Sequence, residues 1–226
     1  MLADGLWIVD ASLDLLPIGR RMTVLRLGDG SLAVHSVVCC DDATQAAIEA
    51  LGPVGWIVVP SRNHTMDAPR WKARYPAARV VTTAASQAAV ARRVAVDGDL
   101  ALLPGGEAVT WQVLDGVPEE AVLLHRDGDG AVTAVFNDAF MNLPDRLPGW
   151  KGRVVALIGS TGGPKVTRTA RWFLVKDRAA YAAHLRRLAA WPGLARVVPG
   201  HGAVVIDDAP AALRRAADGL HPAGAA

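Results

Sequence analysis

The sequence predicts an α/β fold, and three observations carry that prediction. Short apolar runs recur along the whole chain, as the strands of a buried sheet do. In the first half these runs alternate with Ala-rich helical patterns, an order typical of a mixed or parallel sheet. Three of the runs end in loops that carry histidine or aspartate, namely His64 with Asp67, then Asp138, then His201. Three such strand ends predict one shared site at one edge of a sheet.

The first half begins as an antiparallel meander. Strands are expected at residues 6–9, 22–27 and 32–38, and the glycine-containing turn at 28–30 joins the last two as a hairpin. Asp41 or Asp42 can cap a helix over 42–51, which Gly52 and Pro53 end. The pattern then alternates: strand 54–59, helix 68–75, strand 79–82 and helix 85–96.

The second half returns to strands before it ends in helices. A hairpin turn at 127–130 joins two of the predicted strands. The expected strands are 108–114, 121–125, 131–136, 153–158 and 196–198. Helices are expected at 177–191, where Asp177 can cap, and at 208–220. With no linker or repeat in between, the chain is expected to form a single domain over 1–220, followed by a disordered tail at 221–226.

Composition limits the classes of function. The formal net charge is only +2 and the basic residues are scattered, so no nucleic-acid partner is predicted. Neither a signal-like start nor an apolar run of membrane-spanning length is present, so no membrane partner is predicted and a cytoplasmic location is expected. A small-molecule ligand and a homo-oligomer both stay open. Cys39 and Cys40 are adjacent, so a disulfide between them would be strained, and reduced, partly buried thiols are expected.

The segment from Val197 to Gly202 is the most informative part of the chain. It ends an apolar run in Pro-Gly-His-Gly. Glycine on both sides of His201 allows a tight turn and leaves room for an ion or a substrate beside the imidazole. His201 is therefore predicted to be a metal ligand.

Taken together, these features resemble the metallo-β-lactamase superfamily over nearly the whole chain. The shared pattern is an N-terminal meander, a strand that ends in a metal loop, a later strand that ends in Asp, and a late strand that ends in Gly-His. The resemblance implies a four-layer αβ/βα sandwich with metal bound at the rim between the two sheets. More narrowly, the sequence is similar to a poorly characterised bacterial branch of the superfamily, a domain of unknown function, at the segments 5–7, 34–36, 51–54, 60–64, 71–77 and 137–142.

The metal loop departs from the motif of that superfamily, which reads Thr-His-x-His-x-Asp-His. The run at 61–67 matches it without a gap but retains only His64 as a ligand type. Arg62 stands at the first His, Met66 at the Asp and Asp67 at the last His. The separate His before the bridging Asp is also missing, because the region 116–120 carries only carboxylates. By the same resemblance, Asp138 matches the bridging Asp and His201 the final His.

Four candidate metal ligands remain: His64, Asp67, Asp138 and His201. Two histidines and two carboxylates could hold one Zn²⁺, Mn²⁺ or Fe²⁺ with an open position for water, and Asp67 and Asp138 are then the candidate catalytic carboxylates. Such a site would support a mononuclear hydrolase acting on a small ester, lactone, thioester or phosphodiester. Two alternatives stay open: a non-catalytic descendant that holds no metal and binds a ligand or a protein, and an iron-dependent redox protein.

Three basic residues are candidate substrate contacts. Arg62 is expected either to pair with Asp67 or Asp138 or to hold an anionic substrate, and its charge would repel a second cation. Lys165 and Arg168 follow the glycine-rich loop at 159–164, a composition that could bind an anion near the cleft. An aromatic wall is expected from the tryptophans near that cleft, Trp71, Trp150 and Trp172.

Overall fold

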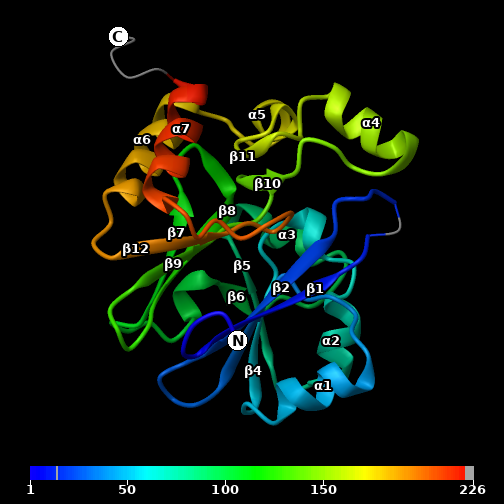
Figure 1. Ribbon diagram of the computed structural model, residues 1–226. Coiled ribbons are helices and arrows are strands. Elements are labelled where there is room, and N and C mark those ends of the chain that lie inside the picture. Colours follow the sequence, from blue (N-terminus) through cyan, green and yellow to red (C-terminus); the bar gives the residue numbers. More distant parts are fainter. Residues whose placement is uncertain (14, 222–226) are drawn as a thin grey trace.

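The computed structural model describes residues 1–13 and 15–221. Two sheets lie face to face with helices outside them (Figure 1). The first sheet has the order β1-β2-β3-β4-β5-β6, with bounds Leu6–Ala11, Arg20–Arg26, Leu32–His35, Val54–Val58, Arg79–Thr82 and Gly98–Asp99. The second has the order β12-β9-β8-β7, with bounds Leu194–Val198, Val132–Val135, Val117–Arg126 and Val109–Leu114. A small third sheet pairs β10 (Met141–Leu143) with β11 (Gly163–Lys165).

The strand directions follow from the connections. β1, β2 and β3 pair antiparallel, as the predicted meander requires, and β3 to β6 run parallel. In the second sheet β7, β8 and β9 pair antiparallel, while β12 joins β9 in parallel. The carboxyl ends of β4, β9 and β12 lead into the loops that carry His64, Asp138 and His201. The three loops therefore lie where the two sheets meet at one rim.

Three of the helices begin at aspartate caps that hydrogen-bond the first turn. Asp41, Asp177 and Asp208 each accept a hydrogen bond from a backbone N–H in the first turn of α1 (Asp42–Glu49), α6 (Arg178–Ala189) and α7 (Ala209–Leu220). The remaining helices are α2 (Ala68–Arg74), α3 (Gln87–Val90), α4 (Gly149–Leu157) and α5 (Arg168–Phe173). In Figure 1, α6 and α7 lie over the second sheet, and α1 and α2 lie beside the first.

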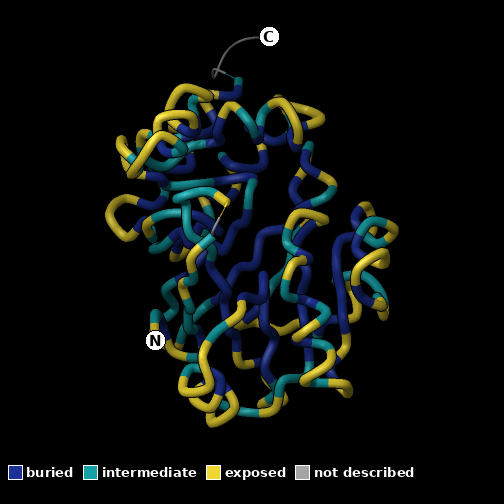
Figure 2. Tube along the Cα trace, turned by 90° about the vertical axis from the view of Figure 1, so that its right-hand side faces the viewer, coloured by how far each residue is buried: buried dark blue, intermediate teal, exposed yellow. Residues whose placement is uncertain are grey.

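Three separate hydrophobic clusters define four layers. Val24, Ile57 and Val80 pack with Ile48 and Trp71 between the first sheet and its helices. Their strand neighbours, such as Leu25, Val58 and Val81, point the other way and pack against the second sheet, with Leu123, Val135 and Val198. Leu124, Ala134 and Val197 then pack outward on α6 and α7, with Tyr181, Leu185 and Leu213. Alternate residues of each strand thus face opposite layers, and the predicted αβ/βα sandwich is confirmed. Figure 2 shows the buried trace through the middle layers.

Two predicted elements are wrong. Residues 153–158 were expected as a strand but belong to helix α4 and its C-cap. Only part of this apolar run is buried: Val155 packs inward, whereas Leu157 is 82% exposed. The helix expected over 85–96 is limited to a short 3₁₀ turn and α3, which ends at Val90. Most of the predicted tail, 222–226, lies outside the described residues. Within the described part of the chain, no helix is both long and apolar enough to cross a membrane.

Candidate metal site

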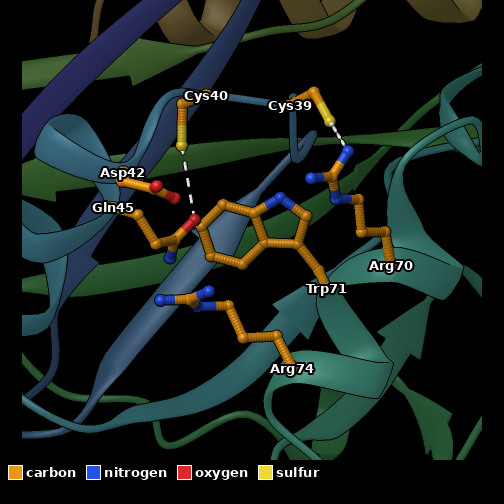
Figure 3. Close-up of a pocket in the computed structure, with 7 residues that line it drawn as sticks. All are labelled: Cys39, Cys40, Asp42, Gln45, Arg70, Trp71 and Arg74. Atoms are coloured by element: carbon orange, nitrogen blue, oxygen red, sulfur yellow. Dashed lines mark hydrogen bonds between the residues drawn. The ribbon is translucent and has the colours of Figure 1, made fainter.

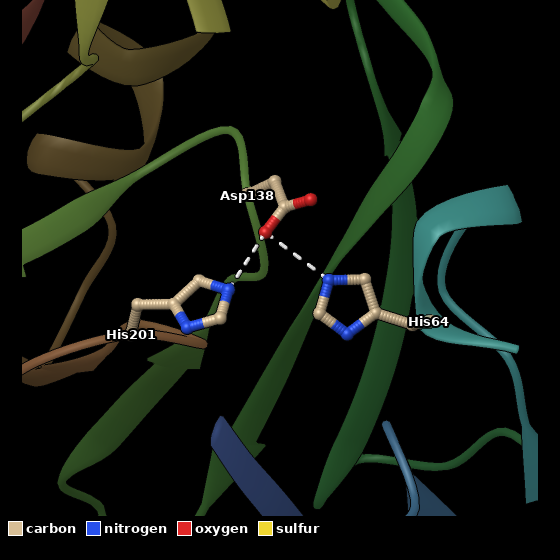
Figure 4. Close-up of side chains that lie close together, drawn as sticks. All are labelled: His64, Asp138 and His201. Atoms are coloured by element: carbon tan, nitrogen blue, oxygen red, sulfur yellow. Dashed lines mark hydrogen bonds and ion pairs between the residues drawn. The ribbon is translucent and has the colours of Figure 1, made fainter. Parts of the chain in front are cut away.

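Three of the predicted ligands converge at the rim between the sheets. One ligand atom from each of His64, Asp138 and His201 lies within 4.8 Å of the other two. Nε2 of His64 and Nε2 of His201 are each 3.1 Å from the same oxygen, Oδ1 of Asp138 (Figure 4). Asp138 and His64 are largely buried and His201 is buried. Two imidazoles and one carboxylate are thus aimed at one point.

The turn that presents His201 is held tightly. Gly202 has φ +90°, and a Cβ there would lie 1.9 Å from the carbonyl oxygen of Asn142. Arg21, which is buried, donates to the carbonyl oxygens of Pro199 (3.2 Å) and Gly202 (2.9 Å) while it pairs with Asp10 (2.7 Å). The predicted need for glycine after His201 is therefore confirmed by the backbone conformation and by this close approach.

Both imidazoles are oriented through their other ring nitrogen. Nδ1 of His201 is 2.6 Å from the carbonyl oxygen of Gly19, and Nδ1 of His64 is 2.9 Å from Oγ of Ser36. Ser36 adopts φ +57°, a left-handed conformation that is uncommon for a residue with a side chain. Partners of this kind fix the ring orientation of metal-ligating histidines. Neither Gly19 nor Ser36 was assigned a role from the sequence, although Ser36 lies in the segment 34–36 that carries part of the resemblance.

The charges within the group stabilise one another. Burial opposes ionisation of Asp138, but the charge of His64 and the hydrogen bond from His201 hold the pKa of this carboxyl well below its usual range. Burial lowers the pKa of His201, yet the hydrogen bond and negative charge of Asp138 outweigh it, so the pKa lies above the ordinary histidine value. The group therefore favours an anionic carboxylate with positive charge beside it.

Asp67, the fourth predicted ligand, is not part of this group. Its Oδ2 accepts hydrogen bonds from Nη1 of Arg20 at 2.7 Å and from the backbone N–H of Cys39 at 3.1 Å. Because Asp67 begins helix α2, its carboxylate ties the His64 loop to β2. Adjacent residues of β2 point to opposite sides, so Arg20 anchors the His64 loop while Arg21 anchors the His201 turn.

Arg62 pairs with Glu119, and not with the expected Asp67 or Asp138. Its Nε lies 3.3 Å from Oε2 of Glu119. By the resemblance to the superfamily, Arg62 stands at the first His and Glu119 falls in the region of the missing separate His. The two altered positions thus face each other as an ion pair. Arg62 remains 51% exposed at its side chain, which leaves its guanidinium within reach of solvent.

The next residue, Glu120, is fully buried beside the metal-site candidate. Burial and the negative charge of Asp138 raise its pKa well above the usual range. Its Oε2 accepts a hydrogen bond from the backbone N–H of Ala139 at 2.8 Å. Its surroundings therefore favour the uncharged form of Glu120, and its carboxyl group supports the loop that follows β9.

Two hollows meet at Asp138 and Asn63. The first, about 170 Å³, is lined by the group itself together with Arg20, Ser36 and Met66. The second, about 150 Å³, is lined by Met141 and by residues of α5 and its C-cap: Thr169, Ala170, Phe173 and Leu174. Asn63 donates weakly to Oδ2 of Asp138 at 3.4 Å. Asn63 was not singled out in the sequence, although it neighbours His64.

The other predicted substrate contacts are placed elsewhere. Lys165 donates to the carbonyl oxygen of Thr161, and the guanidinium of Arg168 stacks over Trp172 at 5.9 Å. Neither lines the two hollows. Trp71 is buried and donates to the carbonyl oxygen of Val38 at 3.0 Å, so it supports the site from behind. Phe173, and none of the three predicted tryptophans, supplies an aromatic ring to the hollows.

Cys39 and Cys40 are both free, as predicted. Cys39 is exposed, more than was expected, and its sulfur lies 3.0 Å from Nη1 of Arg70. The Cys40 thiol instead donates to Oε1 of Gln45 at 3.4 Å. Figure 3 shows the two sulfurs pointing in different directions, toward Arg70 and toward Gln45. Burial raises the pKa of Cys40, so its thiol stays protonated at neutral pH.

Removal of the Ser36 hydroxyl should weaken metal binding by roughly 10- to 100-fold, the usual effect of losing an outer partner of a ligating histidine. Ser36→Ala and Ser36→Gly both remove the contact with His64. Only the glycine variant relieves the left-handed backbone, so its midpoint of urea unfolding should lie above that of the alanine variant. Calorimetric titration of zinc checks the first expectation. Equal zinc affinity in both variants and the unchanged protein would show that Ser36 does not orient His64.

Comparison with known proteins supports the fold alone. No protein-family model matches the sequence, and no curated protein matches it. Among solved structures, the DIM-1 metallo-β-lactamase is 11% identical with a TM-score of 0.61, over 97% of this chain and 95% of that chain. The metallo-β-lactamase FIM-1 from Pseudomonas aeruginosa, in its mono-zinc form, is 13% identical with a TM-score of 0.62, over 98% and 95%. The chain therefore has the metallo-β-lactamase fold and a His-Asp-His group at its rim.

Proposed function

We propose that the protein is a mononuclear metal-dependent hydrolase of a small ester, lactone, thioester or phosphodiester, with one divalent ion held by His64, Asp138 and His201. One observation carries this proposal: Nε2 of His64 and Nε2 of His201 both contact Oδ1 of Asp138. The Nδ1 atoms of the two rings are bound to Ser36 and to Gly19, respectively. The mono-zinc form of FIM-1 supports it, since that protein shares the fold.

The hydrogen bonds of His201 indicate whether His64, Asp138 and His201 are suited to bind a divalent cation. A carbonyl oxygen can only accept, so Nδ1 of His201 carries the proton that binds Gly19. In the neutral ring, Nε2 then presents a lone pair toward an anionic oxygen 3.1 Å away. Such a contact requires a cation between the two atoms or a second proton on the ring. The donor set therefore fits Zn²⁺, Mn²⁺ or Fe²⁺, which prefer imidazole nitrogen and carboxylate oxygen.

The chemistry that a bound divalent ion supplies here is Lewis acidity, which lowers the pKa of water toward neutrality and polarises a carbonyl or phosphoryl oxygen. Asp138 is ionised at neutral pH, and its Oδ2 can orient the attacking water. Asn63 borders both hollows, so its amide can donate to an oxygen of the substrate. The carboxylate of Asp67 is bound to Arg20, and we assign it an anchoring role in place of a catalytic one.

The donor set also favours a second candidate function. Two histidines and one carboxylate are the ligands of non-haem iron oxygenases, so the iron-dependent redox function is retained as that candidate. The non-catalytic alternative corresponds to a doubly protonated His201 that satisfies Asp138 without metal. In that case the group would be a structural ion pair that holds the old metal loop.

Reconstitution distinguishes these functions. Tag-free protein is stripped with a chelator, loaded separately with Zn²⁺, Mn²⁺ or Fe²⁺, and assayed with p-nitrophenyl acetate, a thioester, a γ-lactone and bis-p-nitrophenyl phosphate. The proposal expects zinc or manganese to restore hydrolysis of at least one of them, with loss in the His201→Ala variant. Oxygen consumption with Fe²⁺ alone would favour the redox function. Absence of metal binding with all three ions would leave the non-catalytic alternative.

The Arg62–Glu119 pair should decide how many ions bind. Replacement of both residues by histidine in one variant removes the guanidinium together with its carboxylate partner. It supplies two imidazole nitrogens at the two positions where the superfamily resemblance places histidine. The double variant should then bind two zinc ions per chain where the unchanged protein binds one, as measured by metal analysis after gel filtration. Arg62→Gln with Glu119→Gln, which removes the same ion pair but supplies no imidazole ligand, is the matched control and should leave the stoichiometry at one ion per chain.

A further inference from the structure

The hollow beside α5 is more apolar in its lining than the hollow lined by His64 and His201. Ala170, Phe173 and Leu174 lie at helical spacings of three and four, so they share one face of α5. The hydroxyl of Thr169 is satisfied by contacts with Ser160 and Thr167. Met141 also lines this hollow, so its walls are mainly apolar except where Asn63 and Asp138 border it.

Phe173 stands at this hollow with an exposed ring. It is 66% exposed, although burying an aromatic side chain would gain free energy. Ala170 is buried and Leu174 nearly so, so the floor is fixed while the ring remains open to solvent. An apolar group bound in this hollow would cover the floor and the ring of Phe173.

The size and position of the two hollows limit the size of a bound substrate and the way it can lie across the site. Each is smaller than the roughly 300–1,000 Å³ of an ordinary ligand pocket. They share Asp138 and Asn63, so a molecule that fills both must cross the His-Asp-His group. Its reacting atom would then lie beside the proposed ion, with one substituent on each side.

We infer that the α5 hollow is an acyl-binding site and that the substrate is a carboxylic ester or thioester with an unbranched apolar acyl chain. This inference rests on the proposed function and narrows it. Hydrolysis adds water across the bond between the acyl carbon and the leaving oxygen or sulfur. A carboxylic acid and an alcohol or thiol result, with no oxidant or reductant. The acyl chain lies against Phe173, Ala170 and Met141, and the alcohol or thiol portion lies on the side of Arg20.

A chain-length series tests the inference. The zinc-loaded protein is assayed with p-nitrophenyl acetate, butyrate, hexanoate and octanoate, each rate divided by that of spontaneous hydrolysis. We expect kcat/KM to rise about fourfold per methylene group from acetate to hexanoate. The Phe173→Ser variant should show a much smaller increase of kcat/KM per methylene group. Trp172→Ser is the matched control, because Trp172 is on the same helix and 61% exposed but does not line the hollow; it should leave the series unchanged.

Binding to metal-free protein separates failure of the inference from failure of the proposed function. Calorimetry with butanamide, hexanamide and octanamide should show affinity that rises with chain length and that Phe173→Ser abolishes. Hydrolysis without any chain-length dependence would overturn the acyl site and keep the hydrolase. Chain-dependent binding without hydrolysis of any of the ester, thioester, lactone and phosphodiester substrates would keep the acyl site and overturn the hydrolase. If kcat/KM rose equally steeply with acyl chain length in the Phe173→Ser variant, that result would also contradict the acyl site.

Discussion

Replacement of His201 by alanine should abolish stoichiometric metal binding. The variant removes one of three ligands, whereas loss of a mere outer partner already weakens affinity by roughly 10- to 100-fold. It also leaves the carbonyl oxygen of Gly19 without its donor, since the imidazole contacts this oxygen at 2.6 Å. We expect the zinc content after gel filtration to fall to background and metal-dependent hydrolysis to disappear.

The control for this variant is His221→Ala, at the C-cap of α7. It lies outside the group of potential ligands, so its metal content should equal that of the unchanged protein. Circular dichroism of both variants establishes that each remains folded. Full retention of metal by folded His201→Ala would remove His201 from the ligand set.

Gly202→Ala should destabilise the protein by about 3 kcal/mol or more. A left-handed residue with a side chain costs about 1–3 kcal/mol, and forcing extra atoms into a packed site costs a similar amount. The new Cβ would lie 1.9 Å from the carbonyl oxygen of Asn142, so the turn must move. Because Arg21 and Gly19 hold this turn around His201, zinc affinity should fall as well.

Urea unfolding followed by tryptophan fluorescence measures the change in stability. Gly128→Ala is the control, since a Cβ there meets nothing within 4 Å and the residue has no left-handed backbone. It should change the free energy of unfolding by no more than about 0.5 kcal/mol. An equal effect of the two substitutions would mean that the approach of Gly202 to Asn142 is not a constraint.

The parts of the fold that sequence predicted well are those where periodicity and turns agree. The hairpin turns at 28–30 and 127–130, the aspartate cap of α6 and the strand before His201 all lie where expected. The failure at 153–158 has a physical cause: a short apolar run is compatible with either a strand or a helix, and periodicity alone does not separate the two. Here the run remains on the surface as α4, with Val154 and Leu157 exposed.

The convergence of His64, Asp138 and His201 was predicted from the sequence, whereas the residues that orient them were not. His64, Asp138 and His201 follow strand ends, so topology alone brings them together. The supporting residues are Arg21 on a strand, Ser36 at a strand end and Gly19 in a loop. No chemistry was predicted for them from the sequence, and the three-dimensional structure reveals their contacts. Asp67 looked like a ligand because of its place in the motif, but the sequence could not show that Arg20 lies next to it.

The zinc stoichiometry of the unchanged protein tests the central claim most directly. Tag-free protein is stripped with chelator, equilibrated with excess Zn²⁺, passed through gel filtration and analysed for metal and protein concentration. The His-Asp-His group and the Arg62–Glu119 pair together predict one zinc ion per chain. Two ions per chain would contradict the mononuclear assignment, and none would contradict metal binding at this site.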